Sequence, residues 1–512
     1  MESVFIRELE RYSKSKMLEI LGANKEIFYK LRDHSIIRKD KNNKYYFKFV
    51  GIIILGDFVI NFYPKYITAD DDEVKKIDFK QVLKVLKKAN KANENFSYEN
   101  DESEDSFNLL PLMLFLIEDY FENGVYTDIK KILEINGDGE INWDRTINGT
   151  LPLIKNDEPY YMELHTHRKI DDIYDYFRLL HEYIITDCFT HLEDANLLYY
   201  FDLTPVRLSD KSESDFGDKD YILQRLEKEL NIEFNTHKQQ LLKLMHSYIS
   251  NKDSFANENF FTLYGTSNYE VIWEKMCSEV FENIFTIPLN DLKVDGRLPD
   301  LDLEKLLNDL DLKHLLNDLN LEEITLKHLI EKPNWISEEG YSKLAEKTYI
   351  PDIITISNNN FIILDAKYYN LEFEKNEGDD DPILSGQPGI ESISKQYFYD
   401  LAFRNFVQFI HFKCVRNAFL LPSYDSKINK KCYNKGYVEL KMLHDLGLEN
   451  IQIIMLPANE INNKYLNNDK MDISDLGLNK YDLSKRKHFN KIGGKYCFLQ
   501  GSKFNQMKIR KY

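Results

Sequence analysis

The stretch YIPDIITISNNNFIILDAKYY, residues 349–369, decides the fold of the C-terminal half of the chain. It contains two apolar runs separated by Asn358-Asn359-Asn360, a sequence that favours a tight turn. The pattern therefore predicts two antiparallel strands joined as a hairpin. Asp365 and Lys367 are two positions apart on the second strand, so their side chains point to the same face. Asp352 precedes the first apolar run and would lie opposite them.

Two carboxylates and one ammonium group would thus meet at one end of a small sheet. Carboxylate oxygens are ligands that Mg²⁺ prefers, and the bound ion can activate a water molecule and stabilise charge on a phosphodiester. A nearby Lys can position or deprotonate that water and stabilise the transition state. An ordinary hairpin with charged ends is the alternative, and the spacing alone favours neither.

The Asp-x-Lys pattern by itself has little specificity, because it recurs at Asp128, Asp291, Asp311 and Asp425. Pro299-Asp300 even precedes the copy at Asp311. That copy lies in a Leu-rich helical stretch, where side chains two positions apart diverge by about 200°. The set Asp352, Asp365 and Lys367 is the one that lies on a predicted strand hairpin.

The segments around the hairpin predict a mixed α/β domain over residues 258–460. Two amphipathic helices are expected, at 267–285 and 394–410. Apolar runs at 284–289, 349–356, 361–369, 417–422 and 450–457 are expected to be strands. A helical insertion at about 290–345 interrupts the domain. It contains the near-repeat LEKLLNDLD and LKHLLNDLN, residues 303–320, which we interpret as a helical hairpin or cap.

The rest of the chain predicts an α+β multidomain protein. Residues 1–68 read as two short helices and a β hairpin around Gly56-Asp57, a winged-helix-like module that could bind DNA or protein. Residues 69–107 contain a Lys-rich helix and an acidic tract, which we interpret as a linker. Residues 108–257 form a mostly helical middle region, expected to dock a partner. Residues 461–512 form a basic C-terminal extension.

The overall charge excludes a protein that coats nucleic acid by bulk attraction. The 512 residues include 85 Asp and Glu against 67 Lys and Arg, a net charge of -18. Basic residues gather after Ser484, where no acidic residue occurs. Five of them are candidates for contacts with DNA phosphates: Lys485, Arg486, Lys487, Lys491 and Lys495. A solvated basic terminus explains the same pattern equally well.

The expected location of the protein and the redox state of its cysteines follow from signals that the sequence lacks. It shows no secretory signal, no apolar run long enough to span a membrane and no Cys-x-x-Cys pair. We expect a cytoplasmic protein with free thiols, no zinc site and no membrane contact. His165-Thr166-His167 could place two imidazoles on one strand face, but without a third ligand a structural role is favoured.

The order of helix, three strands, helix and strand around Pro351-Asp352 and Asp365-Ala366-Lys367 resembles the PD-(D/E)xK nuclease superfamily. The resemblance implies that Asp352 and Asp365 bind Mg²⁺, with Mn²⁺ as a substitute, and that Lys367 is the catalytic lysine. The carbonyl group of Ala366 is a further candidate ligand.

Two helical residues complete the resemblance. Many members of the superfamily carry a Glu on the first core helix, and Glu274 is the candidate for a catalytic and metal-binding role. Glu270, one turn earlier, is its rival. Gln396 with Tyr399 resembles the Gln-x-x-x-Tyr element of some branches, although it is one residue short, and Gln396 is the candidate. Both could equally be core residues of their helix.

Three other segments narrow the resemblance: VGIIILGDFVINFYPKY (50–66), GDGEINWDRTI (137–147) and YEVIWEKMC (269–277). They look like those of LlaJI-type restriction endonucleases, which are similar to McrC-like nuclease subunits. This implies an endonuclease that cuts double-stranded DNA in a restriction system, together with a separate McrB-like AAA+ GTPase. The chain has no G-x-x-x-x-G-K-[ST] motif, so any motor must come from a partner.

Two other functions stay open from the sequence. A non-catalytic adaptor would bind DNA or activate the GTPase, but it would not need a complete Asp, Asp, Lys set. A stand-alone DNA repair nuclease would need that set and no partner.

Overall fold

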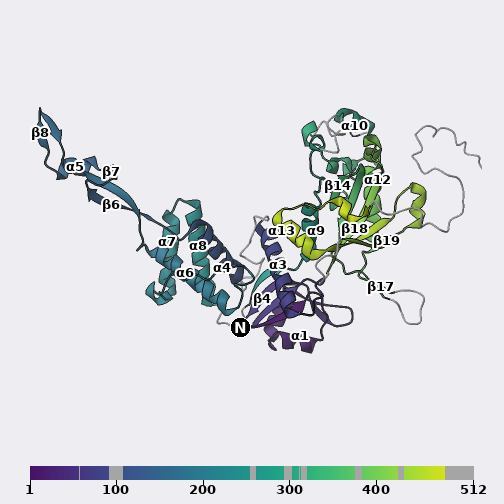
Figure 1. Cartoon of the computed structure of the whole chain (residues 1–512), viewed down its shortest axis with the longest axis horizontal. Coiled ribbons are helices and arrows are strands. Elements are labelled where there is room, and N and C mark those ends of the chain that lie inside the picture. The colour runs from purple at the N-terminus through teal and green to yellow at the C-terminus, as the bar shows by residue number, and fades with distance from the viewer. Residues whose placement is uncertain are drawn as a thin grey trace, which may run out of the picture.

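The computed structural model combines helices with several separate sheets, as the predicted α+β class requires. Figure 1 shows an elongated molecule in which a β arm leads to a helical bundle, and the N-terminal module and a mixed sheet lie beyond it. The structure describes residues 1–56, 58–91, 108–253, 261–292, 302–310, 312, 320–374, 383–424 and 432–478. Lys485, Arg486, Lys487, Lys491 and Lys495 lie outside these ranges, so their contact with DNA stays a prediction.

The N-terminal module contains two short helices and a four-stranded sheet. Its helices are α1 (Lys14–Ile20) and α2 (Lys25–Asp33). The sheet has the order β1 (Glu2–Arg7), β5 (Phe58–Tyr63), β4 (Val50–Leu55) and β11 (Phe261–Thr266). A separate hairpin consists of β2 (Ile37–Lys39) and β3 (Tyr45–Phe47). The predicted hairpin around Gly56 is therefore present as β4 and β5.

The predicted winged-helix module is not confirmed, because β4 and β5 are the central strands of this sheet rather than a projecting wing. β1 pairs with β5 in parallel, and β11 pairs with β4 antiparallel. Gly51 faces Gly265 across the second pair, where a Cβ atom on Gly51 would lie 2.1 Å from the carbonyl oxygen of Tyr264. The local sequence predicts neither outer strand, because each is recruited from a distant part of the chain.

Helix α3 (Asp72–Lys91) joins this module to the C-terminal half, although it lies in the range that we predict as a linker. It packs against α13 (Ala458–Asn467). Asp78 on α3 accepts hydrogen bonds from Asn459 Nδ2 at 2.9 Å and from the hydroxyl of Tyr424 at 2.8 Å. The helix is thus a structural bridge between the two halves.

The middle region is a helical bundle, as predicted, but it also carries an arm of β structure (Figure 1). The bundle helices are α4 (Leu109–Asn123), α6 (Tyr176–Asp194), α7 (Lys219–Ile232) and α8 (Thr236–Asn251), with a 3-10 turn η1 (Glu213–Asp215). The arm consists of β6 (Ile129–Ile135), β7 (Glu140–Ile141), α5 (Trp143–Gly149), β8 (Leu153–Lys155), β9 (Glu158–Tyr160) and β10 (His165–Asp171).

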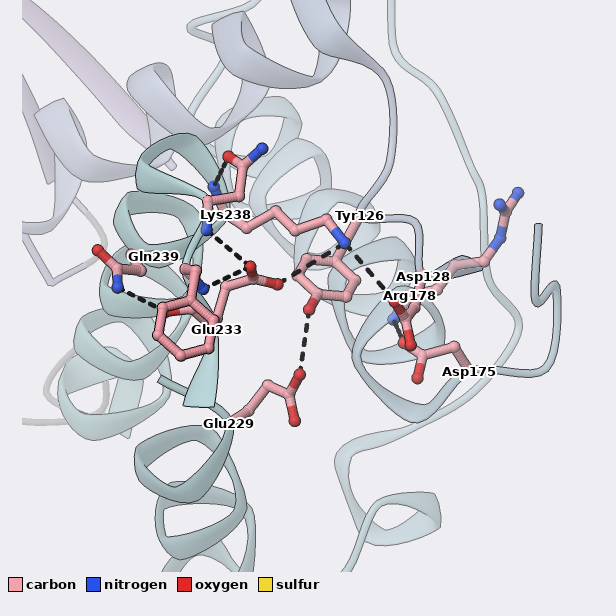
Figure 2. A network of polar contacts seen from close by, with 10 residues as sticks. Tyr126, Asp128, Asp175, Arg178, Glu229, Glu233, Lys238 and Gln239 are labelled. Carbon is pink, nitrogen blue, oxygen red and sulfur yellow. Dashed lines mark hydrogen bonds and ion pairs between the residues drawn. The ribbon is translucent and has the colours of Figure 1, made fainter. Parts of the chain in front are cut away.

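A network of polar side chains fixes the arm at its root (Figure 2). Lys238 lies between Asp128 and Glu233, 3.8 and 3.7 Å from their carboxylate oxygens, and its ammonium group lies 4.9 Å from the centre of the Tyr126 ring. The hydroxyl of Tyr126 donates to Glu229 at 3.4 Å. Because Tyr126 and Asp128 immediately precede β6, these contacts anchor the first strand of the arm to α7 and α8.

The C-terminal half is built on a five-stranded mixed sheet. Its order is β14 (Ile353–Ser357), β15 (Asn360–Ala366), β18 (Val415–Ser423), β20 (Ile451–Pro457) and β19 (Tyr433–Val438). β14 and β15 form the predicted antiparallel hairpin, whereas β15, β18 and β20 run parallel. The mixed α/β character is confirmed.

Helices cover both faces of this sheet. Alternate residues of β15 separate the two cores: Ile362 and Leu364 pack with α9 (Tyr269–Val280) and α13, and Phe361 and Ile363 pack with α12 (Ile390–Ile410). β15 is buried along its whole length, so both of its faces carry apolar side chains, and Asp365 near its end is its single charged residue.

The predicted strand at 284–289 is wrong. Ile284 donates one hydrogen bond to the carbonyl of Ile354 at 2.8 Å, and Pro288 forms only an isolated bridge with Thr325. Proline has no N–H group for a ladder, so this segment turns away from the sheet.

Shorter elements surround the sheet. They are η3 (Leu289–Asp291), α10 (Leu303–Asp309), η4 (Leu321–Glu323), η5 (Leu326–Leu329), β12 (Asn334–Ile336), β13 (Ser342–Leu344), β16 (Glu372–Glu374), β17 (Ile383–Ser385), η6 (Lys441–Leu446) and η7 (Ile473–Leu476). The first copy of the near-repeat contains α10, and residues 313–319 of the second copy lie outside the described ranges. Within those ranges, none of the helices has the length and apolar character needed to cross a membrane.

The bundle should lose stability in acid through His181. This side chain is fully buried, and its Nδ1 accepts a hydrogen bond from the Tyr126 amide at 3.0 Å. Burial lowers the pKa of His181 from 6.5 to about 4. The unfolded chain binds a proton at His181 more readily than the folded chain does. The free energy of unfolding therefore decreases as the pH falls from 6.5 toward 4. Between pH 7 and pH 4, the wild type should lose about 3 kcal/mol more unfolding free energy than His181→Gln. Equal losses in denaturant titrations would contradict this assignment.

Candidate functional site

The structure brings the three predicted charged residues together at the end of the β14–β15 hairpin. Ile353 pairs with Leu364, so Asp352 and Asp365 lie next to each other one position beyond this pair. The Lys367 ammonium group lies 2.9 Å from Asp365 Oδ1 and 3.7 Å from Asp352 Oδ2. The amide of Ala366 donates to Asp352 Oδ2 at 3.0 Å, which fixes that carboxylate against the strand.

The electrostatics of the cluster combine repulsion with partial compensation. Asp365 is only 5% exposed. Burial and repulsion from Asp365 raise the pKa of Asp352 well above its usual value, although Lys367 opposes the shift. Burial alone would lower the pKa of Lys367, but the attraction of the two carboxylates outweighs it and the pKa is raised. The site therefore holds two crowded carboxylates with one ammonium as their counter-charge.

Asn283 holds the start of β14 in place. Its Nδ2 donates to the carbonyl of Asp352 at 2.9 Å, and its Oδ1 accepts from the amide of Ile354 at 3.0 Å and from that of Phe285 at 3.1 Å. The side chain of Asn283 thus bonds to the backbone on both sides of Ile353, the residue that follows Asp352. Asn283 is not predicted from the sequence, because a single Asn after a helix carries no recognisable pattern.

Of the two helical acids, Glu274 lies nearer to the cluster. Burial raises the pKa of Glu274, Lys367 opposes that shift, and Asp365 adds to it, so this carboxylate feels the charges of the site. Glu270 instead forms an ion pair with Lys48 at 2.8 Å. The geometry favours Glu274 over Glu270, and the catalytic role of Glu274 stays a prediction.

Gln396 and Tyr399 occupy different surroundings on α12. Gln396 is 1% exposed, and neither Nε2 nor Oε1 has a hydrogen-bond partner among the described residues. Its backbone carbonyl accepts from Asn417 Nδ2 at 2.9 Å. Tyr399 donates to the carbonyl of Ile350 at 2.8 Å, and burial together with the charges of Asp365 and Asp352 raises its pKa. Of these two residues, Tyr399 is therefore the one whose pKa responds to the carboxylates of Asp365 and Asp352.

The donor set fits a hard divalent cation only in part. Within the described ranges, no group of three or more His, Cys, Asp and Glu side chains is close enough to hold a metal ion. Asp352 and Asp365 nevertheless supply hard oxygen ligands, and a cation would relieve their mutual repulsion. These two residues could hold Mg²⁺, with the Ala366 carbonyl and Glu274 as further candidates.

A cleft of about 400 Å³ opens beside the cluster. Its lining consists of Val271, Glu274, Lys275, Ser278, Asn283, Phe285, Thr286, Lys327, Ile350, Pro351 and Asp352. Glu274 and Asp352 thus share one cleft with two lysines, hydroxyl groups and apolar side chains. Lys327 comes from η5 in the predicted insertion, so no local motif could have linked it to Asp352.

The two histidines of the arm lie on one strand, and the described residues place them in no group of three or more potential metal ligands. His165 and His167 lie on β10, as predicted, and His167 Nε2 is 2.8 Å from Asn142 Nδ2. The arm stands far from the mixed sheet in Figure 1. These observations agree with the structural role that the sequence favours.

Comparisons with known proteins agree on the kind of protein that this chain resembles. The sequence model of the LlaJI restriction endonuclease family matches residues 49–309 and 313–459. A Bacillus subtilis (strain 168) protein, the type II restriction enzyme BsuMI component YdjA, is 26% identical over 498 residues, which cover 95% of this chain and 94% of that protein.

Among solved structures, one chain of a half-complex of Thermococcus gammatolerans McrB AAA+ hexamers with bound McrC is 10% identical. The alignment covers 91% of this chain and 99% of that chain, with a TM-score of 0.33.

Removal of one carboxylate should stabilise the metal-free protein. Asp352→Asn keeps an oxygen that can accept from the Ala366 amide but removes repulsion from Asp365. Because the pKa of Asp352 is raised in the folded state, the gain should be present at pH 8 and shrink as the pH falls toward 4. We expect the unfolding free energy in EDTA at pH 8 to rise by about 1 to 3 kcal/mol. A loss of stability would show that attraction to Lys367 dominates instead.

Proposed function

Because the chain belongs to the LlaJI restriction endonuclease family, we propose that it is the Mg²⁺-dependent nuclease subunit of a bacterial restriction system. Its reaction would be the hydrolysis of phosphodiester bonds in double-stranded DNA. The observation that carries this proposal is the convergence of Asp352, Asp365 and Lys367 at the end of one strand hairpin. The crowding of the buried carboxylate of Asp365 with the partly buried one of Asp352 disfavours the folded state, which is hard to explain in an adaptor that has no use for them.

The chain's own residues would divide the work of hydrolysis. Asp352 and Asp365 would hold the cation, which when bound supplies Lewis-acid stabilisation and a more acidic water. The raised pKa of Lys367 keeps its side chain as an ammonium group, suited to stabilising negative charge on the phosphate. Glu274, half buried at the cleft, would orient the water or complete the ligand set. The products would carry a 5′-phosphate, as the family resemblance implies.

The adjoining cleft supports a nucleic-acid substrate. Lys275 and Lys327 line it together with Ser278 and Thr286, and these groups are donors suited to phosphate oxygens. Phe285 provides an apolar wall for sugar or base. A DNA strand in this cleft would need its scissile phosphate at Asp352, with the lysines in contact with neighbouring phosphates. Lys275 and Lys327 are thus a local source of positive charge in a chain whose net charge is -18.

A separate partner fits the proposal. The name of the Bacillus subtilis relative calls it a component of a restriction enzyme, which indicates that other chains take part. We propose that the partner is an AAA+ GTPase of the McrB type, because this sequence has no P-loop of its own.

The middle region offers a surface for that partner. The outer part of the β arm exposes several large apolar side chains: Trp143, Ile147, Leu151, Leu153, Ile154 and Met162. Leu151 is 94% exposed. Apolar side chains gathered at the end of a projecting arm are typical of a protein contact, since water alone disfavours them.

The nuclease assignment predicts a sharp separation of activity from assembly. Asp365→Ala and Lys367→Ala should each lower plasmid cleavage by at least about 10³-fold, because each removes a group that acts in the transition state. Gel filtration with the partner should be unchanged. Lys413→Ala, an exposed lysine beyond α12, is a matched control that should cut normally. Undiminished cleavage by Asp365→Ala would refute the assignment.

The docking assignment predicts that charge on the arm breaks the complex. Leu151→Asp with Ile154→Asp should weaken co-purification with the GTPase by about tenfold or more, because apolar side chains central to a contact dominate its energy. Thermal unfolding should stay the same, since both side chains are exposed. Phe234→Asp is the matched control, because Phe234 is 93% exposed but lies between α7 and α8. Equal binding by the arm variant and the control would contradict the assignment.

A further inference from the structure

The N-terminal module contacts the chain immediately after the catalytic lysine. Tyr368 follows Lys367, and its hydroxyl donates to Glu8 Oε2 at 2.7 Å. The same hydroxyl accepts from the backbone amide of Lys65 at 3.2 Å. Glu8 directly follows β1, and Lys65 lies just beyond β5, so both come from the N-terminal sheet.

The contact is a buried and fully paired polar cluster. Glu8 is 2% exposed, and Tyr368 is 6% exposed. The ammonium group of Lys65 lies 4.1 Å from the centre of the Tyr368 ring, so its charge faces both the ring and Glu8. Lys65 is the last residue of Tyr63-Pro64-Lys65, a motif that the nuclease chemistry leaves unexplained. Because Lys65 contacts Tyr368, this motif has a structural role at the contact.

A second contact ties the helix of Glu274 to the same module. Lys48 forms an ion pair with Glu270 on α9 at 2.8 Å. Tyr269, also on α9, packs against Tyr368 with ring centres 5.2 Å apart. The end of β15 and the start of α9 are therefore both held against one N-terminal sheet.

The position of Lys367 explains why this anchor matters. β15 ends at Ala366, and the amide of Lys367 makes one further bond, to the carbonyl of Leu420 at 2.9 Å. Beyond that bond the chain leaves the sheet, and the next side chain, Tyr368, is the one held by Glu8. The bond between Tyr368 and Glu8 therefore restrains the backbone just after Lys367, where the ladder of β15 has ended. A shift of about 1 Å in a catalytic group can cost about 10²-fold in rate.

We propose that Glu8 and Tyr368 are positioning residues, through which the N-terminal module holds the Lys367 ammonium group against Asp352 and Asp365. This inference rests on the proposed nuclease function. It assigns the module a task in the cleavage step itself, in addition to any contact with DNA or protein. It also explains why a buried carboxylate is kept at the contact between two parts of the chain.

The test is single-turnover cleavage of supercoiled plasmid by the full-length chain with its GTPase partner. Tyr368→Phe should lower the cleavage rate constant by about 10- to 100-fold, with the half-saturating DNA concentration unchanged within about twofold. Glu8→Ala should do the same, and the double variant should be no worse than either single one. Glu8→Gln keeps an oxygen that can accept from Tyr368 and should restore most of the rate.

Tyr424→Phe is the matched control. Its hydroxyl bonds to the buried Asp78 at 2.8 Å, so this pair also links the N-terminal part to the C-terminal sheet, but away from Lys367. It should lower the melting temperature about as much as Tyr368→Phe while leaving the cleavage rate constant within about twofold.

Equal rate losses in Tyr424→Phe and Tyr368→Phe would show that the slower cleavage comes from a general loss of stability, and this would overturn the inference. A full rate in Tyr368→Phe, with active wild type, would overturn the inference and leave the nuclease assignment standing. A wild-type complex that cuts no plasmid would overturn the nuclease assignment and this inference with it.

Discussion

The pairing of Ile353 with Leu364 is the constraint on which the site depends. This register places Asp352 beside Asp365 at the open end of the hairpin and brings Lys367 against both. A slip of one residue would turn Asp365 and Lys367 to the opposite face of the sheet. The register is set by apolar packing on both faces, where β15 lies between α9 and α12. Apolar packing on both faces of the sheet thus compensates for the repulsion between Asp352 and Asp365.

The rest of the molecule can be understood as support for that end of the hairpin. Asn283, which follows α9, fixes the backbone around Asp352, and the N-terminal module contacts Tyr368 and Glu270. The β arm lies at the opposite end of the molecule, beyond the helical bundle (Figure 1). This separation would allow a partner to bind at the arm without covering the carboxylates. The proposed division between a cutting half and a docking region therefore agrees with the arrangement of the elements.

Local features of the sequence were enough to predict the hairpin and its charged end. Asn358-Asn359-Asn360 between two apolar runs leaves one simple pairing, and a period of two then puts Asp365 and Lys367 on one face. Long-range features could not be predicted in this way. β1 and β11 join a sheet whose other strands lie far away in sequence, and this turned an expected wing into a sheet centre. Asn283 and Lys327 reach the site through tertiary packing alone, and the segment 284–289 has strand composition but is diverted at Pro288.

The central claim is that Asp352 and Asp365 form a site for a divalent cation. The most direct measurement is anomalous diffraction from crystals of the full-length chain grown with Mn²⁺, which can replace Mg²⁺ and scatters strongly. The account predicts one peak within ligand distance of carboxylate oxygens of both residues, and no such peak in Asp365→Asn crystals grown in the same way. A wild-type map without a peak at this pair, or with the same peak in Asp365→Asn, would contradict the account.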